Sequence, residues 1–245
     1  MRTLYQFPIS HYCEKTRWHL DHKGLAFNVD DLFPGLHRLQ SRPMAGIDTL
    51  PILRDGAKVI GDSSAIALYL EAQYPDHPLL PDDAEQRAAI LALEERFDRM
   101  GVHVRRWLYG QIRDWRTVMV AMLKPYRPLF GLRDAMKPVL QRGVLRLYGV
   151  TPPRVERSRV ELLEGLALIE ELTGNDPARY LVGDRLSLAD IAAAALYAPI
   201  FTPAGTPWAE ISGHDGQTQR FLDELHARPA GQWIMRRYAE DRARR

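Results

Sequence analysis

The sequence predicts an α/β domain followed by an all-α helical-bundle domain. Three observations support this division. Residues 1–76 alternate short apolar runs with helix signals in the order β-α-β-α-β-β-α. Residues 77–84 contain two prolines and two aspartates, a composition typical of a linker. In residues 85–245, apolar side chains recur at the three- and four-residue steps of buried helix faces.

The first domain opens with a strand, a helix and a second strand. The apolar run at 2–7 predicts the first strand, and a helix over about 13–23 follows, closed by Gly24. Residues 25–31 have strand character, so the opening is β-α-β. Residues 33–48 contain two prolines and two glycines, and we expect mostly loop there, with one short helix.

Two further strands and a helix complete this domain. Residues 49–60 read as a hairpin around an Asp-Gly turn. A proline inside a central strand would remove a ladder hydrogen bond. We therefore expect Pro51 to begin its strand through a cis peptide bond, which leaves the backbone of Leu50 free for a ligand. The following helix is capped by the polar residues 62–64 and ends before Pro75.

The second domain is predicted from helical periodicity. Two apolar series stand out, and they comprise Ile90, Leu93, Phe97 and Met100, then Val160, Leu163, Leu166 and Ile169. The second series stops at Gly174. Residues 187–198 begin with a Ser-x-x-Asp capping pattern and are otherwise almost wholly apolar, so we expect this helix at the centre of the domain. A last helix is expected over about 216–240.

Composition restricts the function classes. The chain has 245 residues, of which 46% are hydrophobic, with a net charge of +2 and one cysteine. The nearly neutral charge gives no case for a nucleic acid partner, and one cysteine excludes an intramolecular disulfide. The sequence contains no metal-ligand spacing, no signal segment and no apolar run of the ~18 residues that a membrane span needs. We therefore expect a cytoplasmic protein with no bound metal.

One stretch organises the chain, and it reads Ser10-His11-Tyr12-Cys13-Glu14-Lys15-Thr16-Arg17-Trp18. A helix that follows a strand directly leaves its first N–H groups unpaired, and these groups with the helix dipole favour an anion such as a thiolate. The stretch resembles the Cys-Pro-Tyr-Cys-x-Lys signature of glutaredoxins, with Ser10 in place of the first cysteine and His11 in place of the proline. It is still more similar to the opening of serine-type glutathione transferases.

Other motifs extend this resemblance to the whole chain. Leu50-Pro51, Asp62-Ser63 and the cap at 187–190 match the cytosolic glutathione transferase superfamily in order and spacing. The resemblance implies a thioredoxin-like first domain that binds glutathione and a helical second domain that forms the acceptor pocket. It also implies a homodimer, with glutathione as co-substrate and a small apolar electrophile as the second substrate. It does not specify that electrophile.

The resemblance implies roles for three residues near the N-terminus. Ser10 would donate a hydrogen bond to the sulfur of glutathione and so stabilise the thiolate, unless it only caps the helix. Tyr12 could supply a second hydroxyl, or its ring could simply pack between the domains. Cys13 matches the second cysteine of the glutaredoxin signature, and is either a packed helix residue or a redox-active thiol.

The resemblance also assigns the tripeptide site. Leu50, next to Pro51, would pair through its backbone with the cysteinyl part of glutathione. Asp62 and Ser63 would take the ammonium and the carboxylate of the γ-glutamyl end, helped by the helix N-terminus. Plain helix caps at these two positions would look the same in the sequence.

The loop before Pro51 departs from the family pattern. Transferases commonly show Asn-Pro-x-Gly-x-Val-Pro, whereas Gly46 and Pro51 are five residues apart here and Arg42 stands where asparagine is usual. The loop that normally binds the glycine carboxylate is therefore remodelled. His37, Arg38 or Arg42 could supply the missing cation, or each could be ordinary surface charge.

The acceptor pocket is expected in the helical domain. The stretch Arg105-Arg106-Trp107-Leu108-Tyr109 is expected near its wall. The lining candidates are Arg106, Trp107 and Tyr109 from that stretch, followed by Trp115 and Tyr126, although aromatic residues at helical spacing are also typical of a core. Arginines there would suit an anionic acceptor. Residues 124–146 carry six basic residues and one acidic residue and look like an insertion. We favour a solvated face or a dimer element for this segment over membrane contact.

These observations predict a glutathione transferase that activates the glutathione thiol as a thiolate for attack on an apolar electrophile. Two alternatives remain open. One is a glutathione-dependent thiol transferase or reductase that uses Cys13. The other is a transferase-like binding protein without catalysis, whose altered 37–50 loop no longer admits glutathione.

Overall fold

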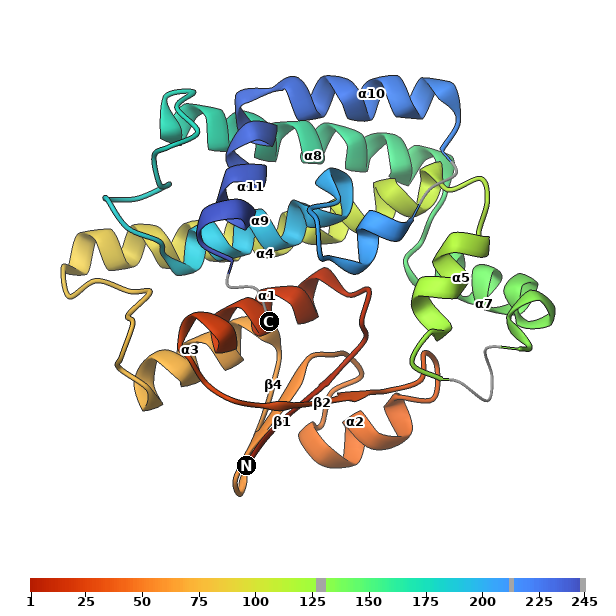
Figure 1. The fold of residues 1–245 in the computed structure, drawn as a ribbon, viewed down its shortest axis with the longest axis horizontal. Helices are drawn as coiled ribbons and strands as arrows, with labels where there is room; N and C mark the ends of the chain where they lie inside the picture. The colour runs from red at the N-terminus through yellow and green to blue at the C-terminus, as the bar shows by residue number, and fades with distance from the viewer. Residues whose placement is uncertain (127–130, 212–213, 243–245) are drawn as a thin grey trace.

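The protein is described by a computed structural model covering residues 1–126, 131–211 and 214–242. A four-stranded sheet with flanking helices is followed by a helical domain (Figure 1). The elements of the first part are β1 (Arg2–Gln6), α1 (His11–His22), β2 (Asn28–Asp31), α2 (Arg38–Ala45), β3 (Ile52–Asp55), β4 (Lys58–Gly61) and α3 (Ser63–Gln73). This order confirms the predicted β-α-β-α-β-β-α domain.

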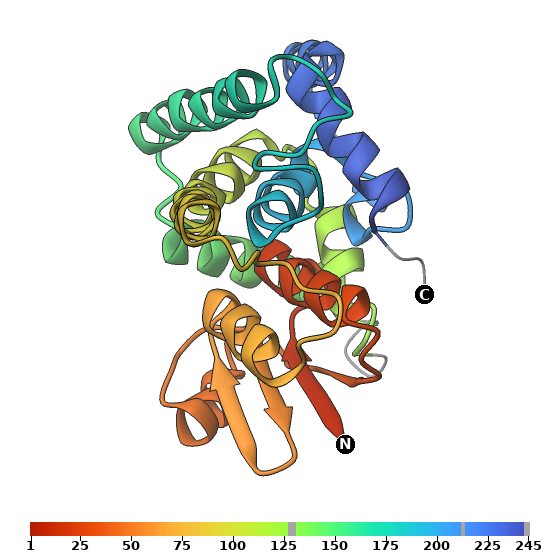
Figure 2. The ribbon, with the colours of Figure 1, turned by 90° about the vertical axis from the view of Figure 1, so that its left-hand side faces the viewer.

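The sheet brings two loops together at one end. Its strand order is β2-β1-β3-β4, with β1 parallel to β2 and antiparallel to β3. Tyr5 of β1 pairs with Ile52 of β3, so the loop after β1 lies beside the loop before β3. Helices α1 and α3 cover the face toward the helical domain, and α2 lies on the other side of the sheet (Figures 1 and 2).

The second part is helical throughout its regular elements. These are α4 (Ala84–Gln111), α5 (Arg116–Leu123), α7 (Arg133–Leu147), α8 (Pro152–Thr173), α9 (Leu188–Phe201), the 3-10 turn η1 (Pro207–Glu210), α10 (Gly216–Ala227) and α11 (Pro229–Glu240). Every residue of α9 is buried, as expected for a helix that is apolar all round. Ser187 and Asp190 form the predicted capping box at its start.

Three details of the prediction need correction. The strand expected over 25–31 is shorter, because only Asn28–Asp31 pairs with β1. The predicted last helix is in fact two helices, α10 and α11. Pro229 is the first residue of α11, because a proline inside one continuous helix would remove a backbone hydrogen bond. Val160 is 48% exposed, and the buried face of α8 contains Leu162 instead. The cis bond between Leu50 and Pro51 is confirmed.

None of the described helices is both long enough and apolar enough to cross a membrane.

Candidate functional site

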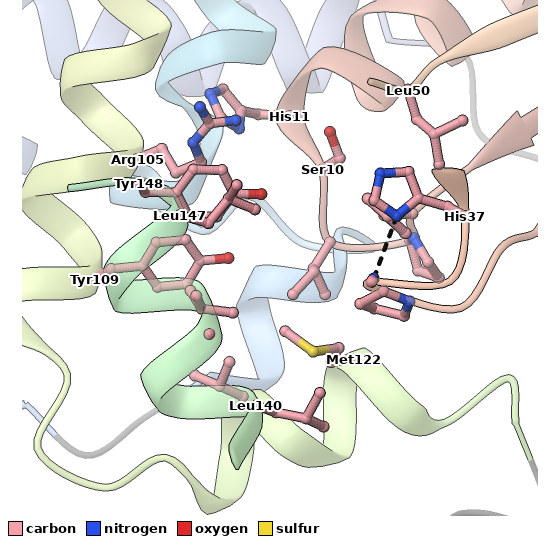
Figure 3. A pocket seen from close by; sticks show the side chains of 18 of the residues that line it. Ser10, His11, His37, Leu50, Arg105, Tyr109, Met122, Leu140, Leu147 and Tyr148 are labelled. Carbon is pink, nitrogen blue, oxygen red and sulfur yellow. Dashed lines mark hydrogen bonds between the residues drawn. The ribbon is translucent and has the colours of Figure 1, made fainter. Parts of the chain in front are cut away.

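A cavity of about 580 Å³ lies between the α/β domain and the helical domain (Figure 3). One wall consists of the loops after β1 and before β3, together with the loop at 34–38. The other wall comes from α4, α5, α7 and η1, and is mostly apolar, with Leu108, Met122 and Leu140 among its side chains. The cavity therefore joins a polar loop wall to an apolar helical wall.

Ser10 stands where these two walls meet. Its backbone is extended, with φ −87° and ψ 121°, and its hydroxyl accepts a hydrogen bond from the N–H of Cys13 at 3.4 Å. The side chain is half-buried and lines the cavity (Figure 3). The hydroxyl also makes a side-chain hydrogen bond with the thiol of Cys13, which lowers the pKa of that thiol against the effect of burial. A serine hydroxyl can rotate, so Ser10 can turn its one hydrogen from Cys13 toward a group in the cavity while its oxygen still caps α1.

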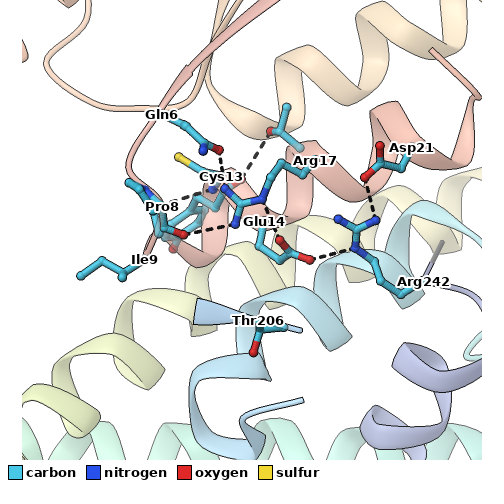
Figure 4. Close-up of polar contacts among 12 residues, drawn as sticks. Gln6, Pro8, Ile9, Cys13, Glu14, Arg17, Asp21, Thr206 and Arg242 are labelled. Carbon is cyan, nitrogen blue, oxygen red and sulfur yellow. Dashed lines mark hydrogen bonds and ion pairs between the residues drawn. The ribbon is translucent and has the colours of Figure 1, made fainter. Parts of the chain in front are cut away.

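An ion cluster fixes the helix that follows Ser10 (Figure 4). The buried carboxylate of Glu14 accepts hydrogen bonds from Arg17 at 2.8 Å and from Arg242 at 2.9 Å. Arg242 also donates to Asp21 at 2.7 Å. Burial alone would raise the pKa of Glu14, but the two guanidinium groups outweigh it and hold that pKa below its usual value. The end of the chain thus holds α1 in place.

A second buried group ties α1 to the helical domain. Lys15 is fully buried and forms ion pairs with Glu94 and Asp98 of α4, the latter at 2.7 Å. It also donates to the hydroxyl of Ser64 at 3.0 Å, at the start of α3. A buried ammonium needs such partners, and here they fix the position of α1 against two other helices.

Tyr12 and Cys13 do not line the cavity. The Tyr12 hydroxyl donates to the backbone carbonyl of Asp98 at 2.8 Å, and its ring packs against the helical core. Cys13 is fully buried in a cluster with Leu50 and Ile52, and burial raises the pKa of its thiol. A buried thiol with a raised pKa is inert rather than reactive.

His11, which stands where glutaredoxins have proline, lines the cavity beside Ser10. It is buried, and one ring nitrogen, Nε2, lies 2.9 Å from the carbonyl oxygen of Gly101. Burial and then the nearby Arg105 lower its pKa to about 3. The ring is therefore neutral at physiological pH and donates through Nε2 to the carbonyl.

The tripeptide residues predicted from the sequence are only partly gathered in the cavity. Leu50 lines it, and no hydrogen bond to its backbone is present among the described residues. The backbone carbonyl of Pro51 accepts from the N–H of Asp62 at 3.2 Å. Asp62 caps α3, accepting from two backbone N–H groups, and Ser63 has a buried hydroxyl without a partner. Neither Asp62 nor Ser63 lines the cavity.

The three candidate cations for the glycine carboxylate differ in position. His37 lines the cavity, but its Nδ1 accepts from Gly35 at 3.2 Å and its Nε2 donates to the carbonyl of Asp48 at 2.9 Å. Burial lowers its pKa, so the ring is neutral with both nitrogens in use. Arg42 is exposed and does not line the cavity, although it is paired with Asp48, which does. Arg38 lines the cavity, 4.0 Å from Asp48.

On the helical wall, one of the five lining candidates is in the cavity. Tyr109 lines it, whereas Trp107 and Trp115 are buried core residues. Arg106 points to the other side of α4, where it donates to the carbonyl of Tyr148 at 3.0 Å and to Ser158. The structure therefore does not bring Arg106, Trp107 and Trp115 to the lining of this cavity.

Sequence reasoning expected Arg105 near this wall without singling it out, and it did not single out Tyr148; both residues line the cavity. A signal for Arg105 existed, because it is four residues before Tyr109 and so lies on the same face of the helix. Tyr148 follows α7, and no local pattern connects it with α4. Helix α7 lines the cavity but contributes no buried residue, and residues 127–130 of the basic segment lie outside the described residues.

Comparisons with known proteins agree on one family. A family model described as the N-terminal domain of glutathione S-transferase matches residues 4–78. The sequence is 26% identical over 231 residues to glutathione S-transferase 1 of Dianthus caryophyllus, covering 92% of this chain and 89% of the relative. It is 34% identical over 176 residues to a stringent starvation protein A homolog of Coxiella burnetii, covering 64% of this chain and 82% of the relative.

A solved structure is similar over nearly the whole chain. It is a glutathione S-transferase from Methylobacterium radiotolerans in complex with glutathione sulfonate. It has 26% sequence identity and a TM-score of 0.59, and the match covers 94% of this chain and 92% of the other.

Proposed function

The chain belongs to the glutathione transferase superfamily, and we propose that it is a glutathione transferase whose Ser10 hydroxyl holds the sulfur of glutathione as a thiolate. The position of Ser10 carries this proposal, because it lines the cavity at the N-terminus of α1 and its hydroxyl can rotate to turn its hydrogen toward a ligand there. The presence of glutathione sulfonate in the similar Methylobacterium radiotolerans structure supports glutathione as the ligand.

The chemistry of Ser10 follows from its place at the N-terminus of α1. The O–H donates to the sulfur, and the N–H of Cys13 donates to the serine oxygen, which makes the hydroxyl a better donor. The unpaired N–H groups of the first turn add a favourable field for a negative charge. Both effects stabilise the thiolate relative to the thiol and lower the pKa of the bound thiol. The thiol proton passes to solvent when the thiolate forms.

The reaction that we propose is nucleophilic substitution or addition. The sulfur forms a new C–S bond with the electrophilic carbon of the acceptor. In substitution, the leaving group departs with the electron pair of its bond to carbon. In addition, that electron pair moves into the acceptor, which then takes a proton from solvent. The protein contributes binding, orientation and the lowered pKa of the thiol.

We propose that the tripeptide lies along the loop wall of the cavity. The free backbone groups of Leu50 support pairing with the cysteinyl part. For the γ-glutamyl end, the unpartnered hydroxyl of Ser63 and the N-terminus of α3 support anion binding just beyond the cavity, next to the carboxylate of Asp62. For the glycine carboxylate we favour Arg38, because both nitrogens of His37 are in use.

We propose that the apolar helical wall receives the electrophile. We also propose a cytoplasmic homodimer, as the family resemblance implies, and sedimentation of the intact protein tests the dimer directly.

The experiment that tests the function is a pH titration of bound glutathione, followed by the ultraviolet absorbance of the thiolate. It compares the wild-type protein with Ser10→Ala and, as a matched control, with Cys13→Ser. In the wild type, the bound thiol should ionise well below the pKa of free glutathione. A hydrogen bond to a charged group contributes about 1.5–3 kcal/mol, so Ser10→Ala should raise the pKa of the bound thiol by about 1 to 2.

Two outcomes would count against the proposal. Unchanged ionisation in Ser10→Ala would mean that the serine is only a helix cap. Loss of the lowered pKa in Cys13→Ser but not in Ser10→Ala would favour the thiol transferase alternative, which the burial of Cys13 does not support.

A second candidate function is that of a transferase-like binding protein without catalysis. The observation that favours it is the similarity to the Coxiella burnetii relative, whose name specifies no transferase activity. Retention on immobilised glutathione separates the two candidates at their first step. A protein that is not retained and that does not bind glutathione in solution would favour the second candidate.

A further inference from the structure

Arg105 is the charged side chain of the helical wall. Within the described part of the chain, the other charged residues that line the cavity are Arg38 and Asp48, which face each other on the loop wall. Arg105 comes from α4, and its guanidinium lies beside the ring of His11 (Figure 3). Among the described residues it has no hydrogen bond and no ion pair, and its Nε is buried without a partner.

Aromatic rings hold this guanidinium in place. Its Cζ lies 3.9 Å from the centre of the Tyr148 ring and 5.7 Å from that of Tyr12. The Tyr148 ring stacks on Tyr109 at 5.6 Å, and Tyr109 stacks on Trp115, also at 5.6 Å. Tyr109 and Tyr148 both line the cavity, and Figure 3 shows their hydroxyl groups directed into it. These contacts position the cation but leave its charge uncompensated.

The surroundings make this charge effective. Arg105 is half-buried, and the side chains around it on the same wall, such as Leu108 and Leu147, are apolar. His11 is neutral, so it neither repels the guanidinium of Arg105 nor adds a positive charge of its own to the site. A partly desolvated guanidinium gains more from a carboxylate than an exposed one does, and its planar fork can bind both carboxylate oxygens.

We infer that the acceptor is an aromatic electrophile that carries a carboxylate or a similar anionic group, and that Arg105 binds this group. The inference rests on the proposed function, since it names the substrate class of the same cavity. The anionic group meets Arg105 and the two tyrosine hydroxyls, while the ring of the acceptor lies against the apolar side chains of α5 and α7. The electrophilic carbon then lies toward Ser10, where the sulfur is held.

The test uses two acceptors that differ at one substituent, the anionic 4-chloro-3,5-dinitrobenzoate and its neutral methyl ester, and each variant is compared with wild type on the same acceptor. With both, the glutathione sulfur forms the C–S bond and chloride leaves with the electron pair of the C–Cl bond. The variants are Arg105→Gln, which removes the charge, and Arg105→Lys, which keeps it. The matched control is Arg99→Gln, because Arg99 is an exposed arginine of the same helix, paired with Glu95.

Arg105→Gln should lower kcat/KM for the carboxylate acceptor by about tenfold or more, the loss expected for one charge-assisted hydrogen bond, and should change kcat/KM for the ester less than about twofold. Arg105→Lys should recover part of the loss, and Arg99→Gln should change neither value. An equal fall for both acceptors, or no fall for either, would overturn the inference. In the first case Arg105 would act on the thiolate or on the shape of the cavity.

A binding measurement keeps the inference separate from the proposed function. Calorimetry with 3,5-dinitrobenzoate and methyl 3,5-dinitrobenzoate, which lack the leaving group, does not depend on turnover. If the wild type turns over neither acceptor but binds the anion in preference to the ester, and Arg105→Gln loses that preference, the anion site stands and the proposed function fails. Equal binding of anion and ester in the wild type would overturn the anion site whatever the activity.

Discussion

Replacing Glu14 with glutamine would test whether the buried ion cluster fixes the helix that carries Ser10. Glu14 is 4% exposed and lies in the first turn of α1. Its carboxylate accepts from Arg17 and Arg242 at 2.8 and 2.9 Å. Glutamine has nearly the same shape, so the substitution removes a charge without opening a cavity. Two largely buried guanidinium groups then lose their shared carboxylate.

The expected loss of stability follows from the acceptors that remain. Removing one partner of a buried ion pair typically costs about 3–5 kcal/mol. Here Asp21 still accepts from Arg242 at 2.7 Å, and the carbonyl of Pro8 still accepts from Arg17 at 3.3 Å. The amide oxygen of the new glutamine can also keep one hydrogen bond. We therefore expect the free energy of unfolding at pH 7 to fall by about 2–4 kcal/mol.

The same carboxylate makes stability depend on pH. Its pKa in the folded protein lies below the ordinary value of 4.5, because the two arginines outweigh burial. The unfolded state therefore binds the proton first as the pH falls. The contribution of Glu14 is fully present above about pH 4.5 and is lost as the pH falls through the folded pKa. In Glu14→Gln this part of the acid sensitivity should be absent.

Urea unfolding at pH 7 and at lower pH, followed by tryptophan fluorescence, measures both effects. The matched control is Glu95→Gln, which removes the same charge from an exposed pair with Arg99 on α4. Exposed pairs contribute little, so the control should change the free energy of unfolding by less than about 0.5 kcal/mol. If Glu14→Gln is no more destabilising than the control, the cluster does not fix α1 and the reasoning fails.

Two further predictions concern the core and the acceptor wall. Asp190→Ala should lower the free energy of unfolding by about 3–5 kcal/mol in urea, because the buried N–H groups of Leu181 and Ser187 lose their acceptor; an unchanged urea midpoint would contradict this. Leu140→Ala should raise KM for an apolar acceptor by about three- to tenfold through lost apolar contact. Its melting temperature should fall by no more than about 4 °C, because Leu140 is only partly buried against the cluster that contains Trp115. A large fall in that temperature would show that α7 is part of the core.

The fold was largely predictable because its signals are local. The caps at Ser10 and Ser187, the hairpin turn after β3 and the cis bond before Pro51 depend on residues adjacent in sequence. The break between α10 and α11 also has a local signal in Pro229, because a proline inside a continuous helix removes a backbone hydrogen bond. The prediction of one helix over about 216–240 did not take this signal into account.

The site was less predictable because its walls meet only in the folded chain. Local pattern placed Ser10 and Leu50 in the cavity, but it could not decide between Arg105 and Arg106, which differ by about 100° around α4. Which arginine faces the cavity depends on Tyr148. Its ring packs against the guanidinium of Arg105, whereas its backbone carbonyl accepts a hydrogen bond from Arg106. That residue is reached through a long connection, so only the tertiary structure gives the answer.

The two sides of the cavity are held with different strength, and this difference bears on specificity. Helix α1 is tied through Glu14 and the fully buried Lys15, so the position of Ser10 is fixed. Helix α7 has no fully buried residue, and Val139 on its cavity side is 71% exposed. Its apolar contact comes from the partly buried Leu140, Val144 and Leu145, so it is held less firmly than α1. Arg105 belongs to α4, the long helix packed against the core, and is therefore on the fixed side.

An acceptor wall that adapts while the cation and the nucleophile stay in place should tolerate different ring shapes. We therefore expect good acceptors to share the anionic group and its distance from the electrophilic carbon, more than the size of the ring that connects them.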